Sequence, residues 1–235
     1  MSTPPAPLVS LGRLLVFSPL GLSFTDDFTG GAPVGFISPA LWVETPPGSG
    51  KWLATGVRGL FTPGGLLAYP NLGRRGRVPP PPVATRNYRV TLDTQYYSPL
   101  YPVPTGVVFP VTPFDDDTDF SALKPTMIVL PLLPNANYPF DGTTAFLNGT
   151  VVTTAGAPAV ALLTAVEPID DTGDIKRTRV MTDPGGRFRL PLRWGNAQSP
   201  TTVTALDPAS MKSTAISLTY PYVLSGSRTI AIPNP

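Results

Sequence analysis

Apolar and polar residues alternate along several short runs of this chain. Phe188 and Leu190 fall on one side of one run, and the arginines next to them fall on the other. Tyr88, Val90 and Leu92 share a side in another run. A period of two residues is that of a β-strand with one buried face. The runs that predict strands in this way are 88–93, 187–190, 216–220 and 229–232.

Proline is so frequent that long helices are excluded. The chain of 235 residues holds 32 prolines and 22 glycines, and its longest stretch without either runs from 83 to 98. An interior proline removes a backbone donor and clashes with the preceding turn of a helix. The stretch from 83 to 98 is itself rich in Thr, Val and Tyr, which favour strands. We therefore predict an all-β protein whose short strands are joined by rigid connections.

Three short motifs occur in the same order in both halves of the chain. The first is a Gly-Ala-Pro motif, the second a Pro-Gly-Gly turn and the third a strand that ends in Leu-Asp. Repetition in a fixed order is typical of duplicated structural units, so we predict two tandem, diverged copies of one small sandwich domain. The paired motifs are Gly31-Ala-Pro with Gly156-Ala-Pro, Thr62-Pro-Gly-Gly65 with Asp183-Pro-Gly-Gly186, and 88–93 with 202–207.

The second copy carries motifs that resemble a known family. Gly149-Thr-Val-Val, Gly156-Ala-Pro and Thr182-Asp-Pro-Gly-Gly-Arg-Phe are similar to the Gly-x-Val, Gly-x-Pro and Thr-Asp-x-x-Gly-x-Phe motifs of the carboxypeptidase-regulatory-like, transthyretin-like β-sandwich. The resemblance covers 141–233 and implies a seven-stranded Greek-key sandwich without activity of its own. Modules of this family commonly act as spacers, decorations or adhesion units, including on phage tails and contractile injection particles. The first copy departs from the pattern, with Thr62 in place of the Asp.

The predicted fold class is therefore all-β, with two tandem Ig-like/transthyretin-like Greek-key β-sandwich domains joined by a proline-rich segment. Because proline is tolerated in edge strands, we expect edge strands at 107–111 and 127–133 within that segment. The predicted divisions are an N-terminal arm at 1–8, a first sandwich at 9–101, the proline-rich linker at 102–140 and a second sandwich at 141–235.

Composition excludes several kinds of chemistry. The chain has no Cys and no His, which excludes disulfides, the usual zinc sites and histidine acid–base catalysis. A nucleophile without such a base is rare, so we predict no enzyme and no cofactor. With 17 basic and 15 acidic residues, the charge balance does not favour nucleic acid as a partner. The sequence shows no signal peptide and no membrane span, which predicts synthesis in the cytoplasm.

Two kinds of residue are candidate contacts with a ligand or partner. Clustered arginines before a proline run are typical of a solvated loop or of ion pairs between subunits, with phosphate contact as the less favoured alternative. Large aromatic residues are typical of a core or a subunit contact, with stacking on a sugar as the less favoured alternative. The candidates are Trp52, Arg74, Arg75, Arg77, Tyr97 and Trp194.

The acidic run contains the only candidate metal ligands. Asp115, Asp117 and Asp119 alternate like the first ligands of a calcium loop. The EF-hand template also needs Gly where Phe120 stands and Glu where Thr126 stands, and it needs flanking helices. A solvated acidic loop is therefore favoured over a looser calcium site.

These observations leave three functions open, and the third is a spacer domain of a surface protein exported by a leaderless route. The favoured one is a non-catalytic structural or attachment component of a large assembly, namely a phage tail, baseplate or contractile injection particle. Its partners are then other protein subunits or further copies of itself, its place is a virion or virion-like particle, and 1–7 and 103–133 are its expected contact segments. The alternative is a carbohydrate-binding or adhesion module displayed on a surface, with a glycan as its ligand.

Overall fold

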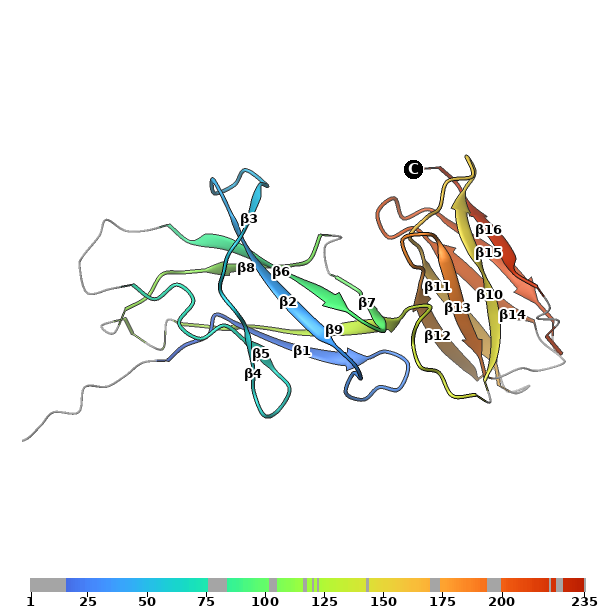
Figure 1. Ribbon diagram of the computed structural model, residues 1–235, viewed down its shortest axis with the longest axis horizontal. Helices are drawn as coiled ribbons and strands as arrows, with labels where there is room; N and C mark the ends of the chain where they lie inside the picture. The colour runs from blue at the N-terminus through green and yellow to red at the C-terminus, as the bar shows by residue number, and fades with distance from the viewer. Residues whose placement is uncertain are drawn as a thin grey trace, which may run out of the picture. The chain divides into compact units, whose positions relative to one another are not determined.

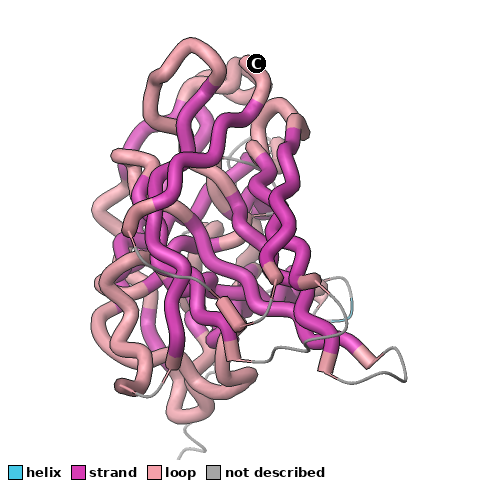
Figure 2. The backbone as a smooth tube through the Cα atoms, turned by 90° about the vertical axis from the view of Figure 1, so that its right-hand side faces the viewer, coloured by secondary structure: helices cyan, strands magenta, loops and turns pink. Residues whose placement is uncertain are grey.

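The computed structural model describes residues 16–75, 84–101, 105–115, 118–119, 121, 123–142, 144–169, 174–193, 200–219, 221–222 and 226–234. These residues form β-strands joined by turns and loops, without an α-helix among them (Figure 2). The all-β prediction is therefore confirmed. The predicted arm at 1–8 and the expected contact segment at 1–7 lie outside the described residues.

Alternation of apolar and polar residues predicts the strand faces correctly. In the strand at 187–192, the buried Phe188 and Leu190 alternate with the more exposed Arg187 and Arg189. The strands of the described residues (Figure 1) are β1 (Leu20–Asp26), β2 (Ile37–Glu44), β3 (Trp52–Ala54), β4 (Leu60–Phe61), β5 (Leu67–Ala68), β6 (Arg86–Thr94), β7 (Tyr97–Pro99), β8 (Val107–Val111), β9 (Thr126–Pro134), β10 (Ala145–Thr153), β11 (Leu162–Pro168), β12 (Ile175–Met181), β13 (Arg187–Leu192), β14 (Thr201–Leu206), β15 (Ser213–Leu218) and β16 (Arg228–Ile232).

The strands β10 to β16 form a β-sandwich. One sheet has three strands in the order β13-β10-β16, and the other has four in the order β12-β11-β14-β15. The chain changes sheet between β10 and β11, between β12 and β13, between β13 and β14, and between β15 and β16. Both sheets contribute apolar side chains to one core, which gains free energy by removing them from water. Members of this core include Leu147, Val151, Leu163, Val180, Phe188, Leu190, Val203 and Ile230.

The strands β1 to β9 repeat the same strand order. One sheet has the order β4-β5-β1-β9-β7 and the other has the order β3-β2-β6-β8. The series β5-β1-β9 corresponds to β13-β10-β16, and β3-β2-β6-β8 corresponds to β12-β11-β14-β15, with β4 and β7 as additions. The third repeated motif falls on the matching strands β6 and β14, and the other two lie in the loops after β1 and β10 and in the turns before β5 and β13. The common order therefore supports two tandem copies of one β-sandwich topology.

Hydrogen bonds extend this correspondence to details. The pair β10–β16 is parallel. Backbone bonds from Thr126 to Pro19 and from Asp27 to Leu132 advance together along β1 and β9, as they do in a parallel pair. The hairpin turns also match, because the N–H of Gly65 donates to the carbonyl of Thr62 at 2.9 Å, just as the N–H of Gly186 donates to that of Asp183 at 2.9 Å.

The segment predicted as a linker contributes two strands to these sheets. β8 stands at the end of its sheet, as expected for an edge strand. β9 lies between β1 and β7, so it is an interior strand and not an edge strand. Pro131 and Pro134 have no N–H to donate, yet both stand within this interior strand, so the loss of those donors does not confine β9 to an edge.

Contacts divide the described chain into two compact units. Unit 1 contains the described residues up to 22, together with 41–89 and 108–128. Unit 2 contains 23–40, 90–107 and the described residues from 129 onward. The buried side chains of unit 1 come from β1, β5 and β8, among other segments, and include Leu20, Leu22, Leu67, Tyr69, Phe109 and Phe114. Unit 2 holds the core of β10 to β16 and the candidate site.

Candidate functional site

Asp26, the last residue of β1, is a buried carboxylate whose two oxygens both accept hydrogen bonds. Its exposed fraction is 1%. Oδ2 accepts the hydroxyl of Tyr138 at 2.7 Å and that of Tyr97 at 3.2 Å, and Oδ1 accepts the N–H of Phe28 at 2.8 Å. A buried charge is tolerated only when such donors replace water. Asp26 therefore ties together the end of β1, β7 and the loop that follows β9.

Aromatic rings pack around this carboxylate. The ring of Tyr138 lies 5.5 Å from that of Tyr97 and 5.6 Å from that of Phe28. Phe140 continues the group, 5.0 Å from Phe28 and 5.2 Å from Phe146 in β10. Edge-to-face and tilted contacts at these distances are favourable beyond the area they bury. The cluster thus connects the loop after β1 with the start of β10.

The environment of the two tyrosines keeps them protonated. Burial raises the pKa of both hydroxyls, and the negative charge of Asp26 raises it further. The N–H of Val34 donates to the oxygen of Tyr97 at 2.9 Å and acts in the opposite direction on its pKa. Hydroxyls of raised pKa do not release protons near neutral pH. They act here as hydrogen-bond donors to Asp26 and not as catalytic acids.

Tyr69 in unit 1 provides a pH-dependent prediction. It is 1% exposed, its hydroxyl has no hydrogen-bond partner among the described residues, and burial raises its pKa to about 12. Because the pKa is higher in the folded than in the unfolded chain, the stability linked to Tyr69 is complete below pH 10 and falls above it. Between pH 8 and pH 11 the free energy of unfolding falls by about 1 kcal/mol from this residue alone.

Urea unfolding of the wild type and of Tyr69→Phe at both pH values tests this. The variant should be at least as stable at pH 8, because it loses an unpaired buried hydroxyl, and it should lose less stability at pH 11. Equal losses in the two proteins contradict the prediction.

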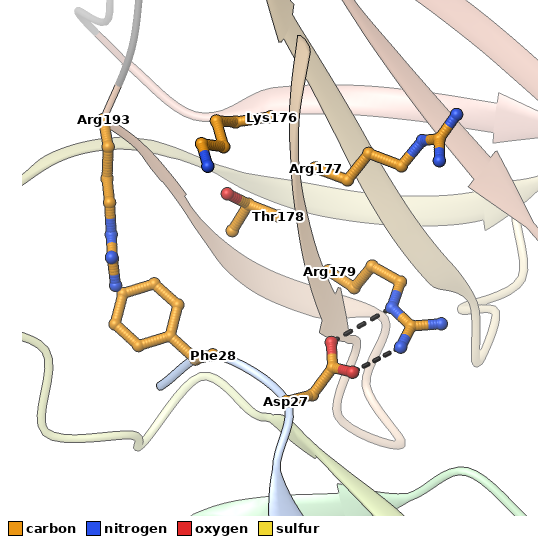
Figure 3. Close-up of a pocket in the computed structure, with 7 residues that line it drawn as sticks. All are labelled: Asp27, Phe28, Lys176, Arg177, Thr178, Arg179 and Arg193. Atoms are coloured by element: carbon orange, nitrogen blue, oxygen red, sulfur yellow. Dashed lines mark hydrogen bonds and ion pairs between the residues drawn. The ribbon is translucent and has the colours of Figure 1, made fainter. Parts of the chain in front are cut away.

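A basic pocket lies in unit 2 beside β12 (Figure 3). Its volume is about 200 Å³. The lining comes from the loop after β1, from β12 and from the residue after β13. Lys176 and Arg193 extend on one side of β12, and Arg177 and Arg179 extend on the other. The residues that line the basic pocket are Asp27, Phe28, Lys176, Arg177, Thr178, Arg179 and Arg193.

Two contacts connect lining residues of the basic pocket to the loop after β1. Arg179 donates from Nε to Oδ2 of Asp27 at 3.0 Å and from Nη2 to Oδ1, so the guanidinium and the carboxylate form a bidentate ion pair. Arg193 places its guanidinium 3.4 Å from the centre of the Phe28 ring, in a cation–π contact. Bidentate pairing fixes the orientation of a guanidinium more strictly than a single hydrogen bond does. Two of the four lining cations, Arg179 and Arg193, are therefore held in place.

Glu167 lies behind the basic pocket and is fully buried. It stands opposite Lys176 in the ladder between β11 and β12. Oε2 accepts the N–H of Arg193 at 3.3 Å, and Oε1 accepts the hydroxyl of Tyr222 at 3.1 Å. Through these bonds Glu167 connects β11 to the residue after β13 and to Tyr222.

The aromatic candidates are placed differently from one another. Tyr97 is 2% exposed and belongs to the Asp26 network, so its ring is part of a core. Trp52 is half-buried on β3, with the guanidinium of Arg89 4.7 Å from its ring and 5.5 Å from that of Trp42. One face of the Trp52 ring is therefore occupied by a guanidinium. Trp194 lies outside the described residues.

The arginine candidates contribute to loop structure. Arg74 forms an isolated bridge with Phe114, and the N–H of Arg75 donates to the carbonyl of Phe114 at 2.8 Å. Both arginines are half-buried. Arg77 lies outside the described residues.

The acidic candidates make local hydrogen bonds. Asp115 accepts the hydroxyl of Thr118 at 2.8 Å. Asp119 accepts the hydroxyl of Ser121 at 2.7 Å and its N–H at 2.9 Å, and these bonds lower the pKa of Asp119. Asp117 lies outside the described residues, and the part of the chain described here contains no group of three or more metal-ligating side chains. A solvated acidic loop stays the prediction, with calcium binding as the less favoured alternative.

Sequence reasoning missed the basic pocket and the Asp26 network. The run Lys176-Arg177-Thr178-Arg179 is as basic as the cluster at 74–77, so a charge scan carries a signal for it. No local pattern links it to Asp27, which is 152 residues away from Arg179. Asp26 and Tyr138 are 112 residues apart. Such contacts arise only when the strands assemble.

Comparisons with known proteins do not identify a family for this chain. No family model matches the chain, and no curated protein matches it. Among solved structures, one described as "Structure of the Streptococcal ancillary pilin" shares 13% sequence identity, with 92% of this chain and 67% of that chain covered, at a TM-score of 0.26. A score of that size does not establish a common fold. The all-β class of the chain follows from its own strands.

No helix among the described residues is both long enough and apolar enough to cross a membrane.

Proposed function

We propose that this chain is a non-catalytic structural and attachment component of a large assembly, of the phage tail, baseplate or contractile injection particle kind. The observation that carries this function is an apolar row on the outward face of a sheet in unit 1. Exposed apolar patches on folded proteins mark surfaces that bind other proteins. The partners are then subunits of the particle or further copies of this chain, and its place is a virion or virion-like particle.

The apolar row crosses strands β4, β5, β1 and β9. Leu60 stands opposite Ala68, and Ala68 stands opposite Gly21, so these three residues share one face. A Cβ at Gly21 would meet the sulfur of Met127 at 2.5 Å, which places Met127 on that face as well. Leu60 is 60% exposed and Met127 is 63% exposed. We define the apolar row as Leu60, Ala68, Gly21 and Met127.

The opposite face of the same strands explains why the apolar row is not needed for folding. Phe61 pairs with Leu67, and Leu67 pairs with Leu22. Leu67 and Leu22 are fully buried, so this face supplies core residues from β5 and β1, whereas Phe61 in β4 is 48% exposed. A strand normally places polar residues on its outward face. Large apolar residues there suit a surface that another protein covers.

We also propose that β10 to β16 form a module of the carboxypeptidase-regulatory-like, transthyretin-like kind. Its support is the three-stranded and four-stranded sheets together with the Thr182-Asp183-Pro-Gly-Gly turn, in which Gly186 has a φ of 75°. Modules of that kind have no activity of their own, which agrees with a structural role.

A double variant, Leu60→Asp with Met127→Asp, tests the structural role. Full burial of each apolar side chain contributes roughly 1.5–3 kcal/mol, so association with particle subunits should weaken by at least about tenfold. Analytical ultracentrifugation of the purified chain and mass spectrometry of particles from producing cells measure the loss.

Met211→Asp is the matched control, because Met211 is 70% exposed and lies outside the apolar row. Its variant should assemble like the wild type, and all three proteins should unfold within about 0.5 kcal/mol of one another. A wild-type chain that is monomeric and joins no particle component contradicts the proposed function.

A further inference from the structure

We infer that the basic pocket binds a carboxylate side chain of an acidic segment on a partner protein. The protein nature of the partner rests on the proposed structural role, whereas recognition of the acidic group follows from the pocket itself. The residues involved are the cations Lys176, Arg177, Arg179 and Arg193 with the carboxylate of Asp27.

Charge is the first reason. Four of the lining side chains are cationic and one is anionic, so the basic pocket has an excess of three positive charges (four minus one). Among the described residues, Arg179 is the lining cation that forms an ion pair, and its partner is Asp27. Lys176, Arg177 and Arg193 are exposed. Like charges held together repel one another, and an anion from outside relieves that repulsion.

The second reason is that one lining cation of the basic pocket, Arg179, already binds a carboxylate, that of Asp27. Arg179 grips Asp27 through both Nε and Nη2, which is the planar geometry that suits a carboxylate. Asp27 comes from the loop after β1 and is 15% exposed at its side chain, while Arg179 is 35% exposed. A carboxylate from another molecule can therefore approach the other lining cations, Lys176, Arg177 and Arg193, next to the pair of Arg179 with Asp27.

The volume of the basic pocket limits the size of the ligand that it can hold. Pockets for drug-sized molecules have volumes of roughly 300–1,000 Å³. The basic pocket has about 200 Å³, which suits one acidic group presented on a larger molecule. The guanidinium carbon of Arg193 lies 3.4 Å from the centre of the Phe28 ring, so this contact holds one of the lining cations in place.

A purely protective role for these charges makes a different prediction. β12 stands at the end of its sheet, and charged side chains on edge strands prevent pairing with other chains. Protection requires charge but no ligand. Binding of an acidic peptide with defined side-chain requirements therefore separates the two roles.

The experiment measures binding of a labelled hexaglutamate peptide to the full chain by fluorescence anisotropy at low and at physiological ionic strength. Hexaglutamine is the uncharged control, and inorganic phosphate and a sulfated disaccharide are the competing anions. We expect hexaglutamate to bind, hexaglutamine not to bind, and the affinity to fall as salt rises. Phosphate and the sulfated disaccharide should displace the peptide only at much higher concentrations.

Variants locate the binding. Lys176→Gln with Arg177→Gln should weaken hexaglutamate binding by about tenfold or more, because two of the four lining cations are lost. The control double variant, Lys212→Gln with Arg228→Gln, removes two exposed cations from outside the basic pocket, the same loss of charge, and should leave binding unchanged. Asp27→Asn should strengthen binding severalfold, because the guanidinium of Arg179 becomes available. Circular dichroism confirms that each variant is folded.

Each outcome has a clear meaning. Loss in the pocket double variant with retention in the control double variant supports the pocket. Equal loss in both shows general charge attraction and overturns it, as does absence of hexaglutamate binding in the wild type and in Asp27→Asn. Displacement by phosphate or the sulfated disaccharide at concentrations similar to the peptide overturns the peptide as occupant. None of these results alters the assembly test of the apolar row, so the two failures are distinguishable.

Discussion

Replacing Asp26 by alanine should lower the free energy of unfolding by at least about 3 kcal/mol, one of the two largest effects expected in this chain. The substitution leaves the hydroxyls of Tyr97 and Tyr138 and the N–H of Phe28 without their acceptor in a buried place. Each unsatisfied buried donor costs roughly 1–3 kcal/mol. Urea unfolding followed by circular dichroism and by tyrosine fluorescence measures the change.

Controls separate the buried network from a general effect of charge. Asp119→Ala removes an exposed carboxylate whose bonds are local to its loop, and it should change stability by no more than about 0.5 kcal/mol. Tyr138→Phe removes one donor and should cost about 1–2 kcal/mol. If Asp26→Ala costs no more than Asp119→Ala, the hydrogen bonds around Asp26 do not stabilise the fold.

Gly186→Ala should destabilise the protein to a similar extent, by about 3 kcal/mol or more. Gly186 has a φ of 75°, a region that side chains with a Cβ rarely adopt. In addition, a Cβ at this position would overlap the carbonyl oxygen of Val151, which is backbone and cannot move alone. The turn between β12 and β13 would have to shift away from β10. Thermal and urea unfolding measure the loss.

The repeated turn provides the matched control. Gly65 occupies the corresponding position in the first copy with a φ of 77°, but a Cβ there would have nothing within 4 Å. Gly65→Ala should therefore cost only about 1–2 kcal/mol, from backbone strain alone. Equal costs at the two glycines would show that the contact with Val151 has no energetic effect.

Much of the fold could be predicted from local patterns. Alternation places Phe188 and Leu190 in the core correctly, and it places Val90 there as well. Repeated motifs predict two related sandwiches, and the two sets of sheets share a strand order. The additions to the first copy, β4 and β7, could not be predicted, because strands of two or three residues are too short to show a period.

The candidate site could not be predicted in the same way. The candidate Tyr97 is in a core because its hydroxyl bonds to Asp26, a partner that no motif links to it. The candidate Trp52 packs against Arg89 from another strand. The basic pocket needs β12 beside the loop after β1. In each case the decisive neighbour is distant in sequence.

By itself, then, the sequence determined the all-β class, the strand faces and the duplication. These properties follow from the period of side chains along a strand, the conformational limits of proline and the turn preferences of glycine, all of which act within a few residues. Only the tertiary structure decided that Asp26 is a buried acceptor, that the apolar row faces outward and that Arg179 pairs with Asp27 in a pocket lined by three further cations. Those properties depend on which strands become neighbours, because burial and charge pairing act through space and not along the chain.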